Sequence, residues 1–294
     1  MTDAFAALSQ SIATRVRAAA PLIVGLDWGT RAQTSAVLWS DGVIVSSEQS
    51  LPEMDTYNAV LPGGERVQAL PIGRDPGTNV AALRVHTPAP ARLPAETPEV
   101  GALVLALGSD GQGGPRVRLG AVETLGPAWQ SQCGGRIDQL IRLDVSLGLA
   151  AEGGPVVDAA GGVLGMSTFG PRKQVLVIPS ATIDRVVGVL VQHGHVARGW
   201  LGVGVQPVAI PDDMAKAVGS SCGLMVLSLA AGAPAAGRVL PGDILVSAGG
   251  TLLQSPKALT TLLTADLIGT TLELRLLRGG VDHQCQVEVA VRPS

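Results

Sequence analysis

The residues best able to do chemistry in this sequence include a glutamate in a glycine-rich turn. Glu152 precedes a Gly-Gly-Pro run in the segment AAEGGP. A carboxylate with a raised pKa can act as a general acid or base. A turn of this composition is also common in ordinary loops, and no second carboxylate stands at a defensible spacing from Glu152. The flanking strands must therefore decide whether the segment marks a site.

Two of the four histidines lie close together. His193 and His195 flank a glycine at the end of a helix predicted over residues 180–194. Two neighbouring imidazoles can bind a metal ion. Histidines at the end of a helix more often interact favourably with the helix dipole. We favour the second interpretation and expect no metal site.

The cysteines predict neither a disulfide framework nor a zinc site. Cys133, Cys222 and Cys285 are odd in number and lack C-x-x-C spacing. We expect ordinary, partly buried thiols, with a bridge between Cys222 and Cys285 as the alternative. No sequence feature calls for a cofactor, and we expect none.

The composition excludes several classes of partner. Of the 294 residues, 46% are hydrophobic and 15% are charged, and the net charge is −3. No basic cluster is present, which argues against nucleic-acid binding. No apolar run approaches the roughly 18 residues of a membrane span. Because Asp3, Arg15 and Arg17 interrupt any signal-peptide pattern, a cytoplasmic location is expected for the sequence as it stands, or a periplasmic one if a leader was removed.

Short apolar and alternating runs divide the chain into domains. Runs punctuated by Gly, Pro and Asp over residues 20–196 predict an all-β domain of two barrels, joined by a Pro/Ala-rich linker near 86–99. An amphipathic helix, capped by Thr2 or Asp3, is expected over residues 1–19. Ser180 is the expected cap of the helix over 180–194. Residues 197–294 predict a small α+β domain. The expected fold class is mainly β.

Several segments, in order, resemble the HtrA/Deg family of serine proteases that carry PDZ domains. They include SAVLWSDGVIVSSEQSL, GRDPGTNVAALRV, AAEGGPVVDAAGGVLGMST and RGWLGVGVQPV. The resemblance covers nearly the whole chain. It implies a trypsin-like double β-barrel with an active site between the barrels, followed by a PDZ domain.

The resemblance places unusual residue types at the positions of the catalytic triad. The family histidine falls on Gln49, the aspartate on Asn79 and the nucleophilic serine on Glu152, while Ala150 occupies a glycine position of the oxyanion hole. An amide cannot act as a general base near neutral pH. We therefore expect no catalytic residues, no enzymatic activity and a polar cluster of these three side chains.

These substitutions suggest a pseudoprotease acting as a protein-binding scaffold, adaptor or chaperone-like factor. The alternatives are non-peptidase chemistry in the old active site, or a regulatory or structural subunit that assembles with an active HtrA-like protease. The family resemblance also implies a homo-oligomer, most simply a trimer. The apolar helix face around Phe5 and Leu8 could pack between subunits.

The PDZ resemblance predicts a site for polypeptide C-termini. Such domains add the ligand as a strand and receive its carboxylate in a nest of backbone N–H groups. The segment RGWLGVGVQPV and the helix SPKALTTLL would form the two sides of this site. The expected residues are Trp200, Leu201, Gly202 and Val203 in the loop, Gly204, Val205 and Gln206 on the strand edge, and Ala258, Leu259 and Leu262 in the pocket.

Overall fold

The computed structural model describes residues 3–29, 33–131 and 133–292. The chain divides into two compact units, Met1–Val196 and Ala197–Ser294. Each unit is described by itself below. No helix among the described residues is both long and apolar enough to span a membrane.

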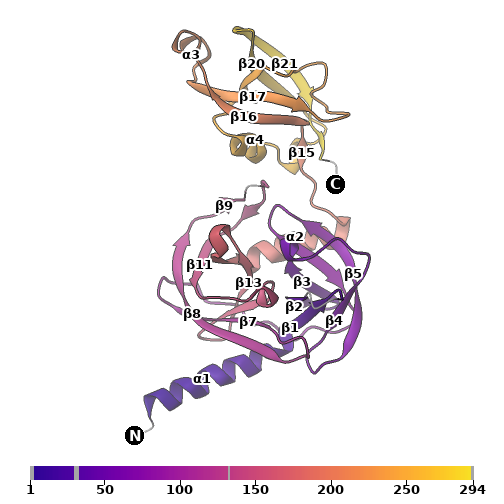
Figure 1. Ribbon diagram of the computed structural model, residues 1–294, viewed down its shortest axis with the longest axis vertical. Coiled ribbons are helices and arrows are strands. Elements are labelled where there is room, and N and C mark those ends of the chain that lie inside the picture. Colours follow the sequence, from indigo (N-terminus) through magenta and orange to yellow (C-terminus); the bar gives the residue numbers. More distant parts are fainter. Residues whose placement is uncertain (1–2, 30–32, 132, 293–294) are drawn as a thin grey trace. The chain divides into compact units, whose positions relative to one another are not determined.

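The first half of unit 1 is a closed barrel of six antiparallel strands (Figure 1). Alternating apolar residues face inward, and Val24, Leu26, Leu38 and Ile44 are almost fully buried. The strands follow the order β1 (Ile23–Asp27), β2 (Gln33–Ser40), β3 (Val43–Ser47), β6 (Val80–Arg84), β5 (Arg66–Asp75) and β4 (Tyr57–Val60).

A second closed barrel follows an extended connection between β6 and β7. Its order is β11 (Leu140–Asp144), β14 (Val175–Pro179), β13 (Val163–Phe169), β12 (Pro155–Asp158), β7 (Leu103–Ser109) and β8 (Pro115–Gly126). A separate hairpin pairs β9 (Trp129–Gln130) with β10 (Arg136–Ile137). The predicted mainly β fold with a double barrel is confirmed.

Two helices accompany the barrels. In α1 (Ala4–Ala19), Asp3 is the cap, because its side chain accepts a hydrogen bond from the Phe5 N–H; the alternative, Thr2, lies outside the described residues. In α2 (Ser180–His193), the predicted cap Ser180 is wrong. Pro179 precedes the helix, and the Ser180 hydroxyl instead donates to the Val163 carbonyl at 2.7 Å.

Five strands of unit 2 are hydrogen-bonded in sequence to form an antiparallel sheet, which two short helices accompany. This arrangement matches the α+β character expected from the sequence. Its order is β16 (Val203–Ala209), β17 (Cys222–Leu229), β18 (Ile244–Ala248), β20 (Thr271–Arg278) and β21 (Val281–Glu288). The short strand β19 (Thr251–Leu252) pairs with β18, and β15 (Gly199–Trp200) pairs with β22 (Ala290–Val291). The helices are α3 (Asp212–Val218) and α4 (Pro256–Leu262).

Single 3₁₀ turns connect several of these elements. Two of them, η2 (Glu48–Ser50) and η3 (Leu149–Ala151), position the candidate site described next. The others are η1 (Ala20–Leu22), η4 (Pro171–Lys173) and η5 (Ala265–Leu267).

Candidate functional site

Glu152 follows η3 and is fixed to the first barrel through its backbone. Its carbonyl oxygen accepts hydrogen bonds from the Thr34 hydroxyl at 2.7 Å and the Ser35 N–H at 2.9 Å. The next residue, Gly153, has φ +84°, and a Cβ there would lie 2.2 Å from the Ser35 carbonyl oxygen. Only glycine permits this approach. The Gly-Gly-Pro turn therefore holds the Glu152 backbone against β2.

Glu152 is 5% exposed, and one oxygen of its carboxylate accepts several hydrogen bonds. Oε1 receives the Gln49 amide at 2.6 Å, the Ser47 hydroxyl at 2.8 Å and the Thr168 hydroxyl at 3.0 Å. The Phe169 N–H is a fourth, longer donor at 3.3 Å. Buried polar groups need such partners, and these come from both barrels.

Asn79 joins the same cluster from the end of a tight turn. Its φ of +58° lies in the left-handed region, which asparagine tolerates better than most residues. The Asn79 Oδ1 accepts from the Gln49 N–H at 2.7 Å, and Nδ2 donates to the Ser47 hydroxyl at 3.0 Å and the Thr168 hydroxyl at 2.6 Å. The structure thus brings Gln49, Asn79 and Glu152 together, and the assignment of these positions to a family triad stays a prediction.

The fourth assigned position, Ala150, lies within η3. Its carbonyl oxygen accepts a hydrogen bond from the Ser35 hydroxyl at 2.6 Å. The Glu152 N–H donates to the Leu149 carbonyl at 3.2 Å within the same turn. Both contacts fix the backbone on which Glu152 is presented.

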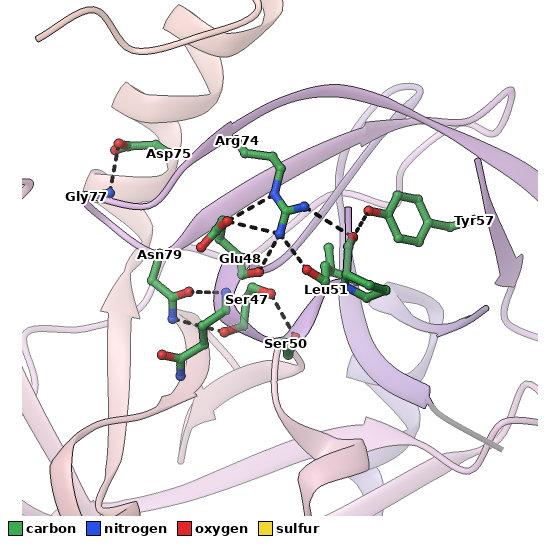
Figure 2. A network of polar contacts seen from close by, with 11 residues as sticks. Ser47, Glu48, Ser50, Leu51, Tyr57, Arg74, Asp75, Gly77 and Asn79 are labelled. Carbon is green, nitrogen blue, oxygen red and sulfur yellow. Dashed lines mark hydrogen bonds and ion pairs between the residues drawn. The ribbon is translucent and has the colours of Figure 1, made fainter. Parts of the chain in front are cut away.

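An arginine holds the turn that carries Gln49 (Figure 2). Arg74 lies 3.0 Å from the Glu48 carboxylate and donates to the carbonyl oxygens of Glu48 at 2.9 Å and Leu51 at 2.6 Å. Tyr57 donates to the Pro52 carbonyl beside it. Burial raises the pKa of Tyr57, although the charge of Arg74 opposes this shift. Arg74 therefore fixes η2 by satisfying its carbonyl groups.

Sequence reasoning missed three members of this site, namely Ser47, Thr168 and Arg74. Ser47 stands in the segment SSEQSL, only two residues before Gln49, so it ends β3 just before the turn η2 that carries Gln49. Thr168 lies on β13 of the second barrel, and its proximity to Ser47 depends on the packing of the barrels. No local pattern distinguishes Thr168 from other strand residues.

The cluster combines a carboxylate, two amides and two hydroxyl groups. A carboxylate can accept a proton, and the Ser47 and Thr168 hydroxyls both donate to it. Both hydroxyl residues are buried, with exposures of 0% and 4%. Glu152 is likewise buried, whereas Gln49 is exposed, so the cluster meets the surface at Gln49.

The two neighbouring histidines lie at the end of α2. The His195 Nδ1 is 3.0 Å from the His193 carbonyl oxygen, and both residues are exposed. His195 also forms an isolated bridge with Arg74 through the backbone. Cys133, Cys222 and Cys285 are free thiols.

The second candidate site lies before β16 in unit 2. The carbonyl oxygens of Leu201 and Gly202 accept from the N–H groups of Ala235 at 3.1 Å and Ala230 at 2.8 Å. Within the part of the chain that the structure describes, neither the Leu201 nor the Gly202 N–H has an acceptor. Gly202 has φ +75°. Two successive N–H groups without acceptors form a potential anion-binding nest.

The adjoining strand provides an open edge. Among the described strands, β16 pairs with β17 alone, and α4 packs against β16. Val203 and Val205 on the strand are partly buried, as are Ala258 and Leu262 on the helix. These four side chains can contact an added strand.

The structure changes the description of four residues of the predicted peptide site. Val203 begins strand β16 and pairs with Leu229, so it does not belong to the preceding loop. Leu201 and Leu259 are 1% and 5% exposed and belong to the core of unit 2. Burial of these two leucines leaves Ala258 and Leu262 as the helix residues at the surface. Trp200 lies in β15, so its predicted place in the loop is wrong, whereas Gly204 and Gln206 lie in β16 with Val205 as predicted.

Comparisons with curated proteins identify bacterial serine endoproteases as relatives. The chain is 29% identical over 272 residues to a probable periplasmic serine endoprotease DegP-like of Brucella suis biovar 1, covering 88% of this chain and 52% of the relative. It is 29% identical over 278 residues to a protein of the same name from Rhizobium meliloti, covering 90% and 54%. The chain spans about half the length of these relatives.

Solved structures lead to the same family. A serine endoprotease from Yersinia pestis matches with a TM-score of 0.73 and 25% identity, covering 96% of this chain and 98% of the other. The HtrA-type protease AlgW with a tripeptide matches with a TM-score of 0.70 and 26% identity, covering 96% and 97%.

These comparisons contradict the predicted function. The chain was expected to be a non-catalytic pseudoprotease with a scaffold, adaptor or chaperone-like role, and not an enzyme, yet its relatives are named serine endoproteases. The prediction treated the missing imidazole as decisive. The structure shows a carboxylate at Glu152 with two hydroxyl groups hydrogen-bonded to it, and a carboxylate can itself act as a general base.

Family models assign both units. The model for a trypsin-like peptidase domain matches residues 34–166, and the model for a PDZ domain matches residues 199–289. The two models occur in the order expected from the sequence, on a double barrel and on a small α+β unit. The chain therefore belongs to the HtrA/Deg family, with a trypsin-like domain followed by a PDZ domain.

Proposed function

We propose that this chain is a polypeptide-binding member of the HtrA/Deg family whose PDZ domain recognises polypeptide C-termini. The observation that carries the proposal is the pair of N–H groups at Leu201 and Gly202 beside the open edge of β16. A terminal carboxylate would accept from the N–H groups, and the preceding residues would pair with β16. The structure of AlgW with a tripeptide supports peptide binding by a related protein.

The apolar surface between β16 and α4 favours an apolar last residue in the ligand. Titration of the full chain with peptides ending in valine, each as free acid and as amide, tests the proposal. We expect the free acids to bind at least tenfold more tightly, because only they carry the charge that the N–H pair receives. Equal affinity of acid and amide would contradict carboxylate recognition.

Peptide-bond hydrolysis is the activity that the names of the relatives suggest for unit 1. Digestion of casein by the full chain, compared with a heat-denatured sample, measures it directly. The relatives are also named periplasmic, and we propose the same location for this chain. This favours the second of the two locations expected from the sequence.

We further propose that the chain self-associates, most simply as a trimer, through the outer part of α1. Ile12 and Val16 pack against the core of unit 1, whereas Phe5 and Leu8 are 78% and 45% exposed. Exposed apolar residues on one helix face favour burial against another subunit.

Light scattering of the wild-type chain is expected to return a multiple of 29.8 kDa at micromolar concentration. Replacing both Phe5 and Leu8 by glutamate should shift the mass to that of one chain, because burying two unpaired charges between subunits is energetically unfavourable. The exposed Gln10 provides the control, since Gln10→Glu adds a charge to the same helix. A wild-type mass of one chain would exclude the proposal.

A further inference from the structure

The hydrogen bonds to the Glu152 carboxylate are distributed unevenly between its two oxygens. All four donors, from Ser47, Gln49, Thr168 and Phe169, reach Oε1. Among the residues that the structure describes, no donor reaches Oε2. One oxygen is therefore anchored in the cluster, and the other has no partner in the chain.

Oε2 is also accessible from outside the protein. Among the described residues, Trp129 Nε1 is the only side-chain nitrogen or oxygen that is both enclosed and without a hydrogen-bond partner. Because Oε2 lacks a partner and is not enclosed, it must be open to solvent. The small exposure of Glu152 as a whole, 5%, restricts that opening to a narrow approach.

The hydrogen bonds around Oε1 all run toward that oxygen as the acceptor. Asn79 Nδ2 donates to the Ser47 and Thr168 hydroxyls, which leaves their own hydrogens to point at Oε1. The Gln49 amide adds a third donor. Oε1 is therefore fully used within the cluster, and only Oε2 is left for a ligand.

No cation among the described residues forms an ion pair with the Glu152 carboxylate. The ion pairs of the described chain do not include Glu152, and Arg74, which holds the neighbouring turn, is paired with Glu48. A nearly buried carboxylate without a cationic partner is electrostatically costly. A positively charged ligand at Oε2 would remove that cost.

We propose that Glu152 Oε2 is a binding point for the ammonium or guanidinium group of a lysine or arginine side chain in a bound polypeptide. The site lies in the trypsin-like unit and does not depend on recognition of C-termini by the PDZ domain. The hydrogen bonds to Oε1 fix the orientation of the carboxylate and so the direction in which Oε2 faces. This fixed orientation makes the site selective for a cationic group that approaches from that direction.

The test compares two blocked pentapeptides, Ac-Ala-Ala-Lys-Ala-Ala-NH2 and its norleucine analogue, by calorimetric titration of the full chain. Their amidated C-termini remove the carboxylate that the PDZ domain is proposed to bind. We expect the lysine peptide to bind at least tenfold more tightly, which corresponds to about 1.4 kcal/mol. Glu152→Gln should abolish this preference, because it retains the acceptor Oε1 and replaces the charged oxygen with an amide.

Glu53→Gln is the matched control, since it removes an exposed negative charge from the same unit and should retain the preference. A second measurement needs no variant: the carboxyl carbon resonance of Glu152 should shift with n-butylammonium and not with n-butanol. Equal binding of the two peptides, a preference that survives Glu152→Gln, or equal shifts with both small molecules would overturn the proposal.

Discussion

Replacing Glu152 by alanine is expected to lower the free energy of unfolding of unit 1 by roughly 3 kcal/mol, since each buried donor left unsatisfied costs about 1–3 kcal/mol. The substitution removes the single oxygen that accepts from Ser47, Gln49, Thr168 and Phe169. Water entering the vacated space offsets part of the loss. Glu152→Gln should cost less, because its amide oxygen can still accept these hydrogen bonds.

Urea unfolding followed by tryptophan fluorescence can isolate this effect. Trp200 is the only tryptophan of unit 2, so a Trp200→Phe background makes the signal report on unit 1 alone. Glu53→Ala is the control, and a change within about 0.5 kcal/mol is expected for such an exposed position. A loss for Glu152→Ala no larger than that of the control would show that the cluster does not stabilise the junction of the two barrels.

Replacing Gly202 by alanine is expected to weaken binding of a C-terminal peptide by on the order of tenfold to a hundredfold, or about 1.4–2.7 kcal/mol. An added Cβ would lie 2.4 Å from the Ala233 Cβ and 2.8 Å from its Cα. These distances are too short, so the loop must move away from Ala233. That movement displaces the N–H groups of Leu201 and Gly202 from the position in which they can meet a carboxylate together.

Gly219→Ala separates this effect from backbone strain. Gly219 has the same φ of +75° and ends α3, but an added Cβ there meets no atom within 4 Å. Both variants therefore place an alanine in the left-handed backbone conformation, which is equally unfavourable in each. Only Gly202→Ala also displaces the N–H groups of the nest. Peptide affinities of both variants would be measured by calorimetry with the free acid. Equal losses in the two variants would assign the effect to general destabilisation.

The sequence alone determined the architecture of this protein. Short apolar runs punctuated by glycine and proline predicted the barrels, and the change in pattern near residue 197 predicted a separate α+β unit. These features are local, since alternation and turn residues act within a few positions of one another. The resemblance of ordered segments also identified Gln49, Asn79 and Glu152 as residues worth examining together.

Only the tertiary structure decided what surrounds those residues. Ser47 on β3 and Thr168 on β13 are 121 positions apart in sequence, yet their hydroxyls meet on the Glu152 carboxylate. The same packing leaves Oε2 open, orients the Leu201 and Gly202 N–H groups without acceptors, and buries Leu201 and Leu259. The type of a side chain limits its chemistry, but its partners, burial and access depend on the strands packed around it. For that reason the residue types at three positions were insufficient to predict activity, and the comparisons contradicted that prediction.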